Sequence, residues 1–196
     1  MAVDRFFLRK VPGVTFYKSI GTGSGEKFTP SDANPLVWGV VVVADDLSVL
    51  EKSRPIKSWR KISTSELRLI LQPISSHGAW GGKNPFVVSE KSTEGEVVAL
   101  TRARIKWRKN PMFWRAVPPV TASLHGQPGL LKAIGIGEAP IGLQGTLSIW
   151  QSADALRTFA YKSAPHINAI AATQANKWYS EELFARFALI EEQGSI

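Results

Sequence analysis

Three histidines are the side chains of this sequence best suited to acid–base or metal chemistry, and one of them has a setting that favours ligation. His77 and His125 each lie beside a glycine, in SSHGAW and SLHGQP, and these contexts predict exposed loop histidines. His166 lies in YKSAPHINAI, where Ser163 can cap a helix and Pro165 suits its first turn. The positive end of a helix dipole disfavours imidazolium, and a metal requires the neutral ring. His166 is therefore predicted to be either a structural histidine or a metal ligand.

Most other catalytic and metal-binding patterns are missing from the sequence. It contains no cysteine, which excludes disulfides, thiolate metal ligands and cysteine nucleophiles. It also contains no HExxH, no cluster of two histidines and a carboxylate, and no Gly-x-Ser-x-Gly. Non-haem metal sites and serine hydrolase chemistry are thus not indicated. One axial histidine in a deep apolar pocket is still sufficient to hold a haem.

Basic residues concentrate in TRARIKWRKN, at positions 101–110. Arg102, Arg104, Lys106 and Arg108 occupy every second position, so on a strand they share one face. The pattern predicts either a solvated strand face or a basic wall that binds a carboxylate or a phosphate. Nucleic acid is not expected as a partner, although the net charge is +8, because zinc-finger spacing, an RNP-like motif and a clear recognition helix are missing.

A pattern of Lys-small-Ile-Gly-x-Gly occurs twice, in KSIGTG (Lys18–Gly23) and in KAIGIG (Lys132–Gly137). A glycine loop that binds phosphate is followed by a helix, whose N-terminal amides contact the anion. Here a strand is predicted after each copy, so a nucleotide site is not expected. The glycines are instead expected to permit a bulge or a tight bend. The repeat indicates a duplicated fold.

Apolar periodicity and turn residues predict the elements that position these residues. Strands are expected at 14–21, 36–46, 66–74, 97–107, 130–140, 143–150 and 181–192. Helices are expected at 46–62, at the start of 110–129, and at 152–179 with a joint at 163–165; the intervening segments 22–35 and 75–86 are loops. Residues 97–192 then have the β-α-β-β-α-β order of a ferredoxin-like unit, and 14–74 match its last four elements.

An α+β fold of tandem ferredoxin-like repeats with one barrel-like core follows from this order. We expect a degenerate N-terminal ferredoxin-like half at 1–90 and a second half at 91–196, packed as one unit. No apolar run reaches the roughly 20 residues that span a bilayer. The N-terminal MAVDRFFLRK does not resemble a secretory signal, and a cytoplasmic protein is expected.

Several longer motifs resemble the spheroidene monooxygenase family of carotenoid-oxygenating proteins. The resemblance is strongest between Lys132 and Phe187, in KAIGIGEAPIGLQGTLSIWQSADALRTFAYKSAPHINAI and KWYSEELFARF. KSIGTGSGEKFTP near the N-terminus and LTRARI (Leu100–Ile105) are similar to the family as well. The resemblance implies a dimeric-α/β-barrel-type fold within one chain and a haem b cofactor. It further implies insertion of oxygen from O₂ into an apolar substrate, a carotenoid in this family.

The resemblance also implies roles for individual residues, while no catalytic residue is assigned. His166 falls on the FAY…H segment and is the implied ligand of the haem iron. Arg102, Arg104 and Lys132 are candidates for the haem propionates, because a buried carboxylate needs a cationic partner. Candidates for the pocket wall, with plain core packing as the alternative for the first two, are Trp150, Phe159, Tyr161 and Ile170.

Several alternatives and partners belong to this interpretation. Lys18 and Lys132 share a repeat position, so a common structural role is the alternative for both. No flavin or ferredoxin module is recognised in the sequence, so electrons are expected from an external ferredoxin or reductase. Contact with the periphery of the inner membrane and assembly into a homo-oligomer are left open. The alternative functions are a haem protein that catalyses dehydration, peroxidation or N-oxidation, a cofactor-free barrel that binds or oxidises an apolar molecule, and a non-enzymatic binding module.

Overall fold

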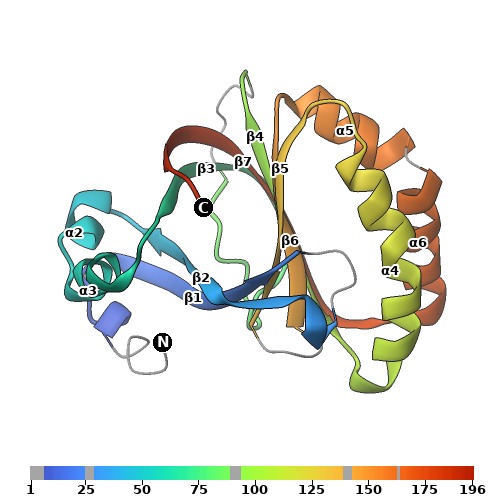
Figure 1. Cartoon of the computed structure of the whole chain (residues 1–196), viewed down its shortest axis with the longest axis horizontal. Coiled ribbons are helices and arrows are strands. Elements are labelled where there is room, and N and C mark those ends of the chain that lie inside the picture. The colour runs from blue at the N-terminus through green and yellow to red at the C-terminus, as the bar shows by residue number, and fades with distance from the viewer. Residues whose placement is uncertain (1–6, 25–28, 89–93, 139–142, 163) are drawn as a thin grey trace.

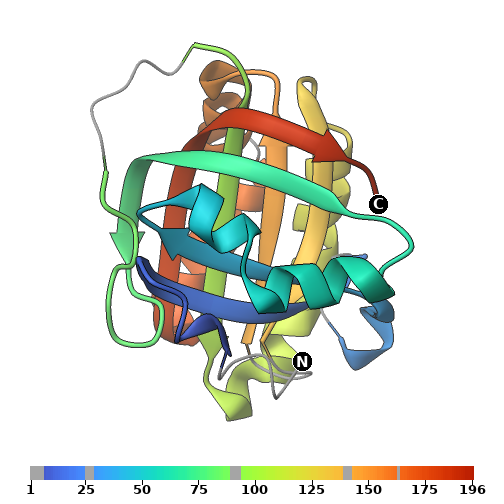
Figure 2. The ribbon, with the colours of Figure 1, turned by 90° about the vertical axis from the view of Figure 1, so that its left-hand side faces the viewer.

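A single antiparallel sheet that curls on itself forms the centre of the molecule (Figures 1 and 2). The computed structural model describes residues 7–24, 29–88, 94–138, 143–162 and 164–196. The strands are β1 (Val14–Gly23), β2 (Ala33–Ala44), β3 (Leu67–Gly78), β4 (Val97–Ile105), β5 (Leu130–Gly137), β6 (Leu143–Trp150) and β7 (Tyr179–Gly194). Their order in the sheet is β2-β1-β5-β6-β4-β7-β3, and every neighbouring pair is antiparallel.

The second half of the chain forms a ferredoxin-like unit. Its helical elements are η2 (Trp107–Lys109), α4 (Asn110–His125), α5 (Ala153–Lys162) and α6 (Ala164–Asn176). Strand β4 lies between β6 and β7, with β5 on the far side of β6, as the β-α-β-β-α-β unit requires. The three α-helices lie together on one side of this part of the sheet (Figure 1). The predicted α+β fold class with ferredoxin-like repeats is confirmed.

The first half repeats this unit without its first strand and first helix. Its elements are β1, η1 (Pro30–Asp32), β2, α2 (Leu47–Glu51), α3 (Arg54–Ile62) and β3, which correspond in order to β5, β6, α5–α6 and β7. Strand β1 pairs with β5, and β3 pairs with β7, so counterparts from the two halves lie side by side. No counterpart of β4 occurs among the described residues, and β2 and β3 remain the edges of the sheet (Figure 2).

The repeated glycine pattern pairs with itself across the junction of the two halves. Gly21 lies opposite Gly137, and Gly23 lies opposite Gly135, so equivalent residues exchange places as a two-fold axis would require. The register of β1 against β2 shifts immediately after Gly21, which is the bulge that the sequence predicts. The pairing of β5 with β6 is regular at Gly135, so the bulge forms only in the first copy.

Two apolar clusters lie on the two faces of the sheet, because successive side chains of a strand point to opposite faces. On β4, Val98 and Leu100 face the interior of the curl, whereas Val97 and Ala99 face α4 and α5. The interior cluster consists of Phe16, Ile20, Trp80, Phe86, Val98, Leu100, Ile136, Ile149, Leu183, Ala185 and Phe187. The cluster beneath the helices consists of Val97, Ala99, Leu124, Trp150, Leu156 and Phe159.

Two histidines lie in regular elements rather than in the predicted loops. Helix α4 continues to His125 through the pair Pro118–Pro119, although the sequence predicts that the helix ends loosely. Val117, Thr121 and Leu124 are buried at helical spacing, and this packing outweighs the hydrogen bonds lost at the prolines. His77 belongs to β3, which continues to Gly78 because it pairs there with β7.

Candidate functional site

A buried group of charges lies at one end of the curled sheet. We call Lys18, Trp80, Arg102, Glu138 and Glu181 the Arg102 cluster. Arg102 continues the inward-facing series of β4 and is 3% exposed. Its Nε and Nη2 donate to Oε1 of Glu138 at 3.0 and 2.8 Å, and its Nη1 pairs with Glu181. Lys18 Nζ lies 3.2 Å from Oε2 of Glu138.

The two carboxylates also fasten a connecting segment over the interior. This segment, residues 79–88, follows β3, and we call it the plug segment. Trp80 donates from Nε1 to Glu138 at 2.8 Å, while the backbone amides of Gly81 and Gly82 donate to Glu181 at 3.1 and 2.7 Å. The Arg102 guanidinium lies 5.6 Å from the centre of the Trp80 ring, within cation–π range. The plug segment is thus held by groups whose charges Arg102 balances.

Both carboxylates of the cluster are held in their ionised form. Burial alone raises the pKa of Glu138, but Arg102, Lys18 and Trp80 together outweigh it, and that pKa lies below its ordinary value. Burial also raises the pKa of Glu181, and the amides of Gly82 and Gly81 together with Arg102 bring it below the ordinary value. The cluster therefore pairs two cations with two anions. Arg102 has no uncompensated charge to offer to an anionic ligand.

The interior next to the cluster is filled in this conformation. Aromatic side chains meet edge to face there: the Phe16 ring lies 5.5 Å from Trp80, and Phe86 lies 4.9 Å from Phe187. The pocket bordered by Arg102, Trp80 and neighbouring strand residues has a cavity volume of about 0 Å³, which leaves no room for a water molecule. Ligand pockets are typically about 300–1,000 Å³, so an organic ligand enters only if side chains that fill this space, Trp80 among them, withdraw. The aromatic and aliphatic side chains of the interior cluster are of a kind that suits an apolar ligand.

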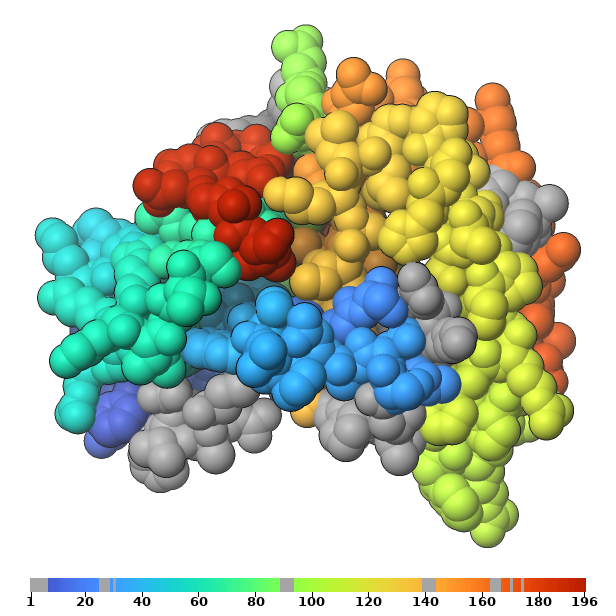
Figure 3. Space-filling view, viewed as in Figure 1, coloured from blue at the N-terminus to red at the C-terminus, as the bar shows by residue number. Residues whose placement is uncertain are grey.

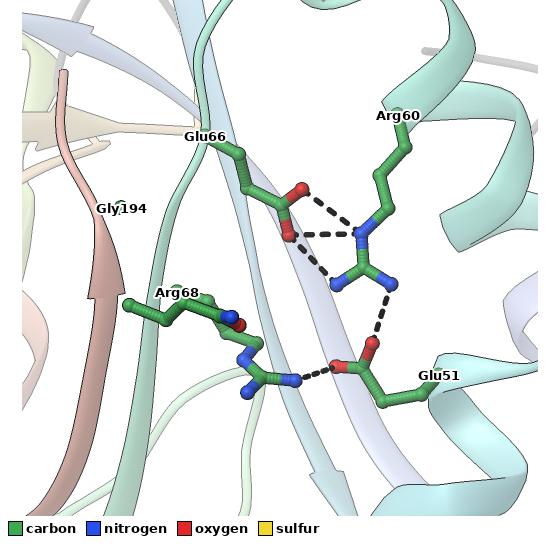
Figure 4. A pocket seen from close by; sticks show the side chains of 6 residues that line it. Glu51, Arg60, Glu66, Arg68 and Gly194 are labelled. Carbon is green, nitrogen blue, oxygen red and sulfur yellow. Dashed lines mark hydrogen bonds and ion pairs between the residues drawn. The ribbon is translucent and has the colours of Figure 1, made fainter.

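A second pocket, on the surface beside β3, is polar (Figure 4). It is lined by Glu51, Arg60, Glu66, Arg68, Gln193 and Gly194. Arg60 donates from Nη2 to Glu66 at 2.8 Å, and Arg68 lies 3.0 Å from Glu51. The hydrogen bonds that Arg60 donates to Glu66 and then to Glu51 raise the pKa of Arg60. These charges satisfy one another, and the pocket does not suit an apolar molecule.

The structure does not bring the predicted site residues into one place. Arg102 faces the interior, but Arg104, two residues further along β4, is exposed. Lys132 pairs with Glu192 at 2.9 Å, five residues before the cluster end of β5. Trp150 and Phe159 stack with their ring centres 5.4 Å apart on the opposite face of the sheet, beneath the helices.

Three further predicted residues belong to the helices of the second half. Tyr161 lies near the end of α5 and is 68% exposed. His166 is the third residue of α6, which agrees with its expected place in the first turn of a helix, and Ile170 lies one turn further on. The side chains of His166 and Ile170, and all of Ser163, lie outside the part of the structure that is described.

Sequence reasoning selected Arg102 but missed its anionic partners. Glu138 follows the second glycine copy directly, while Lys18 begins the first, so the pairing of the two copies brings these residues together. Lys18, Arg102, Glu138 and Glu181 all lie in the motifs KSIGTG, LTRARI, KAIGIGE and KWYSEEL that carry the family resemblance. The occurrence of all four residues in these motifs is the feature of the sequence that could have identified Glu138 and Glu181 as partners of Arg102.

Two kinds of feature are missing from the described residues. No three His, Cys, Asp or Glu side chains there come together in a way that would hold a metal ion. Within the same ranges, no helix has both the length and the apolar character needed to cross a bilayer.

Comparison with known sequences relates the whole chain to one group of proteins. No protein-family model matches it. Spheroidene monooxygenase of Rhodobacter capsulatus is 41% identical over 202 residues, which cover 100% of this chain and 83% of that protein. Spheroidene monooxygenase of Cereibacter sphaeroides is 34% identical and covers 97% of this chain, which spans 60% of that protein. The protein of the same name from Rubrivivax gelatinosus is 31% identical, with coverages of 93% and 72%.

Comparison with solved structures gives distant likenesses. A protein of Fusobacterium nucleatum has a TM-score of 0.49 at 10% identity, covering 99% of this chain and 86% of that chain. A haem-degrading enzyme of Listeria monocytogenes has a TM-score of 0.36 at 12% identity, with coverages of 94% and 92%. Both TM-scores are below 0.5, and we draw nothing about function from them.

Proposed function

This chain belongs to the spheroidene monooxygenase family, and from that premise we propose that it inserts one oxygen atom of O₂ into a carotenoid. The predictions of family and of an oxidoreductase are confirmed by the three relatives. The observation that carries the proposal is the 41% identity that extends over the entire chain. The aromatic interior around Phe16 and Phe187 supports an apolar substrate, because the buried cluster there consists of aromatic and aliphatic side chains.

The reaction requires electrons that this chain does not supply from its own side chains. One oxygen atom enters a C–H bond of the substrate, and the other leaves as water after it takes up two electrons and two protons. An external ferredoxin or reductase is the proposed donor, because protein side chains do not carry out such redox chemistry without a cofactor. A cytoplasmic location and a homo-oligomeric state remain predictions.

Haem is the proposed cofactor, and His166 is its proposed ligand. When bound, haem would supply the activation of O₂. The third position of α6 supports this role, because the positive end of the helix dipole favours the neutral imidazole that binds iron. The Arg102 cluster does not fit a haem propionate, since Glu138 and Glu181 already neutralise the guanidinium and the adjoining pocket is small. The haem proposal therefore depends on His166.

A cofactor-free barrel that binds or oxidises an apolar molecule is the second candidate. The observation that favours it is the apolar interior, in which Trp80 and Phe86 belong to the buried cluster of aromatic and aliphatic side chains. Displacement of the plug segment would open a site lined by aromatic rings. Such a site binds an apolar molecule without any metal.

An absorption spectrum separates the two candidates. The protein is produced with added haem precursor and purified, and a Soret band that copurifies with it is the result expected for a haem protein. His166→Ala is expected to lose or shift this band, whereas His77→Ala and His125→Ala serve as matched controls and retain it. Turnover is measured with carotenoid, reductant and isotopically labelled O₂, with one labelled oxygen atom expected in the product. A His166→Ala protein with the parent's haem content, spectrum and turnover would refute the ligand assignment.

A further inference from the structure

The stretch of sequence that leads into α4 carries only positive charge. Between residues 97 and 137 there are seven lysines and arginines and no aspartate or glutamate. Four of these cations follow one another within a few residues, at Arg104, Lys106, Arg108 and Lys109. Regions of one sign on an otherwise mixed surface attract partners of the opposite sign. This segment therefore has the charge needed to attract an anionic partner.

The same segment exposes large apolar side chains on a projecting corner. Trp107 in η2 is 75% exposed, and Met112 in the first turn of α4 is 43% exposed. Arg104, Lys106 and Arg108 are exposed as well. Figure 3 shows the yellow-green start of α4 projecting beyond the neighbouring elements. We call residues 104–112 the basic corner.

We propose that the basic corner docks this protein onto the anionic surface of a lipid bilayer. Tryptophan favours the level of the lipid headgroups, where its ring is partly buried and its N–H remains hydrated. Lysine and arginine beside it are drawn to anionic lipids. The Arg108 guanidinium lies 5.0 Å from the centre of the Trp107 ring, so the cation and the apolar anchor lie next to each other.

A lipid surface fits this corner better than a nucleic acid does. Single-stranded nucleic acid is bound in a basic groove with several stacking rings, and duplex DNA is bound by an element that enters a groove. Here the exposed apolar side chains of the basic corner are one tryptophan and one methionine, and neither lines either of the two pockets described above. Isolated exposed apolar residues are common, but here two of them lie in a segment whose charged residues are all basic.

Docking in this way would turn one end of the sheet toward the membrane. The basic corner begins two residues after Arg102, so it lies at the same end of β4 as the Arg102 cluster and the plug segment. A carotenoid dissolves in the apolar part of a bilayer, and this end would face its source. This last step rests on the proposed function, whereas the docking itself does not.

Vesicle sedimentation with the full-length protein tests the proposal. The probes are vesicles of phosphatidylcholine alone and of phosphatidylcholine with phosphatidylglycerol. Each cation near an anionic membrane contributes about a factor of five to partitioning, so Lys106→Ala combined with Arg108→Ala is expected to weaken binding about 25-fold. Trp107→Ala is expected to weaken it about tenfold, through the loss of aromatic area buried among the lipids.

Matched controls come from α3, away from the basic corner. Lys57→Ala combined with Lys61→Ala removes the same charge from exposed positions, and Ile62→Ala removes a side chain that is 73% exposed. Both are expected to bind like the parent, and circular dichroism verifies that every variant is folded. The proposal is overturned if the parent binds both vesicle types equally or not at all, or if corner and control variants bind alike. Tight binding to a soluble polyanion that Trp107→Ala leaves unchanged would also overturn it, in favour of an acidic macromolecule.

Discussion

Replacement of Arg102 by alanine should destabilise the protein strongly, because it leaves two carboxylates without their shared cation. The side chains of Arg102, Glu138 and Glu181 are only 2%, 7% and 16% exposed. Opposite charges about 4 Å apart attract by about 4 kcal/mol at an effective dielectric constant of about 20, and this attraction is offset by the desolvation of each group. Removal of one partner of a buried ion pair costs about 3–5 kcal/mol, and we expect Arg102→Ala to lie in this range.

The measurement is the free energy of unfolding in denaturant, followed by tryptophan fluorescence at about pH 7. Arg104→Ala is the matched control, since Arg104 lies two residues along the same strand and is exposed. Its effect should stay within about 0.5 kcal/mol. If Arg102→Ala were no more destabilising than Arg104→Ala, the charges of the Arg102 cluster would be solvated rather than buried, and the reasoning would be refuted.

The difference in the free energy of unfolding between the parent and Arg102→Ala should also become smaller at acidic pH. In the parent, the pKa of Glu138 lies below the ordinary value of 4.5, so its ionised form adds stability above that pH. This contribution is lost as the pH falls through the folded pKa. In the variant, burial is opposed only by Lys18 and Trp80, and the Glu138 pKa rises. Protonation of Glu138 then removes the unpaired buried charge that destabilises the variant. In the parent, the same protonation removes the ion pair with Arg102 and lowers the free energy of unfolding. A difference that stays constant down to about pH 4 would contradict this linkage.

Two further predictions concern the plug segment. Trp80→Ala removes a side chain that is 1% exposed, packs on Phe16 and donates to Glu138, so it should lower the free energy of unfolding by about 3–5 kcal/mol in the same denaturation assay; a loss below about 1 kcal/mol would mean that the interior is not packed around it. Gly78→Ala should lower the melting temperature more than Gly82→Ala does. Both glycines have positive φ, +92° and +82°, which costs alanine roughly 1–2 kcal/mol. A Cβ at Gly78 would also lie 2.2 Å from the carbonyl oxygen of Glu182, whereas one at Gly82 would meet nothing within 4 Å. Equal melting temperatures would contradict the close approach of the end of β3, directly before the plug segment, to β7.

The sequence by itself determined the order and type of the elements. Apolar alternation in strands and turn residues between them are local properties, and they located all seven strands to within a few residues. The glycine repeat indicated the duplication before any pairing was known. Prediction was wrong where packing outweighed local preference. Helix α4 passes through Pro118 and Pro119 because its buried face is anchored on both sides of them.

The sequence determined less about the candidate site. Alternation along 102–108 predicted that the cations share a face, and it left a solvated face and a ligand-binding face as alternatives. The structure gives a third answer, because the series is divided between Arg102 and Arg104, near the end of β4. Arg102 lies inside the sheet, while Arg104 and the residues of η2 reach solvent.

Only the tertiary structure decided which charges meet. Arg102 binds Glu138 and Glu181, which are 36 and 79 residues away along the chain. Periodicity states which residues of one strand share a face, but it carries no information about the strand that will lie opposite. That choice depends on the pairing of β6 with both β4 and β5 and on the pairing of β4 with β7, which bring distant segments together. The physical reason is that side-chain charges interact through space over a few ångströms, whereas the sequence records only neighbours along the chain.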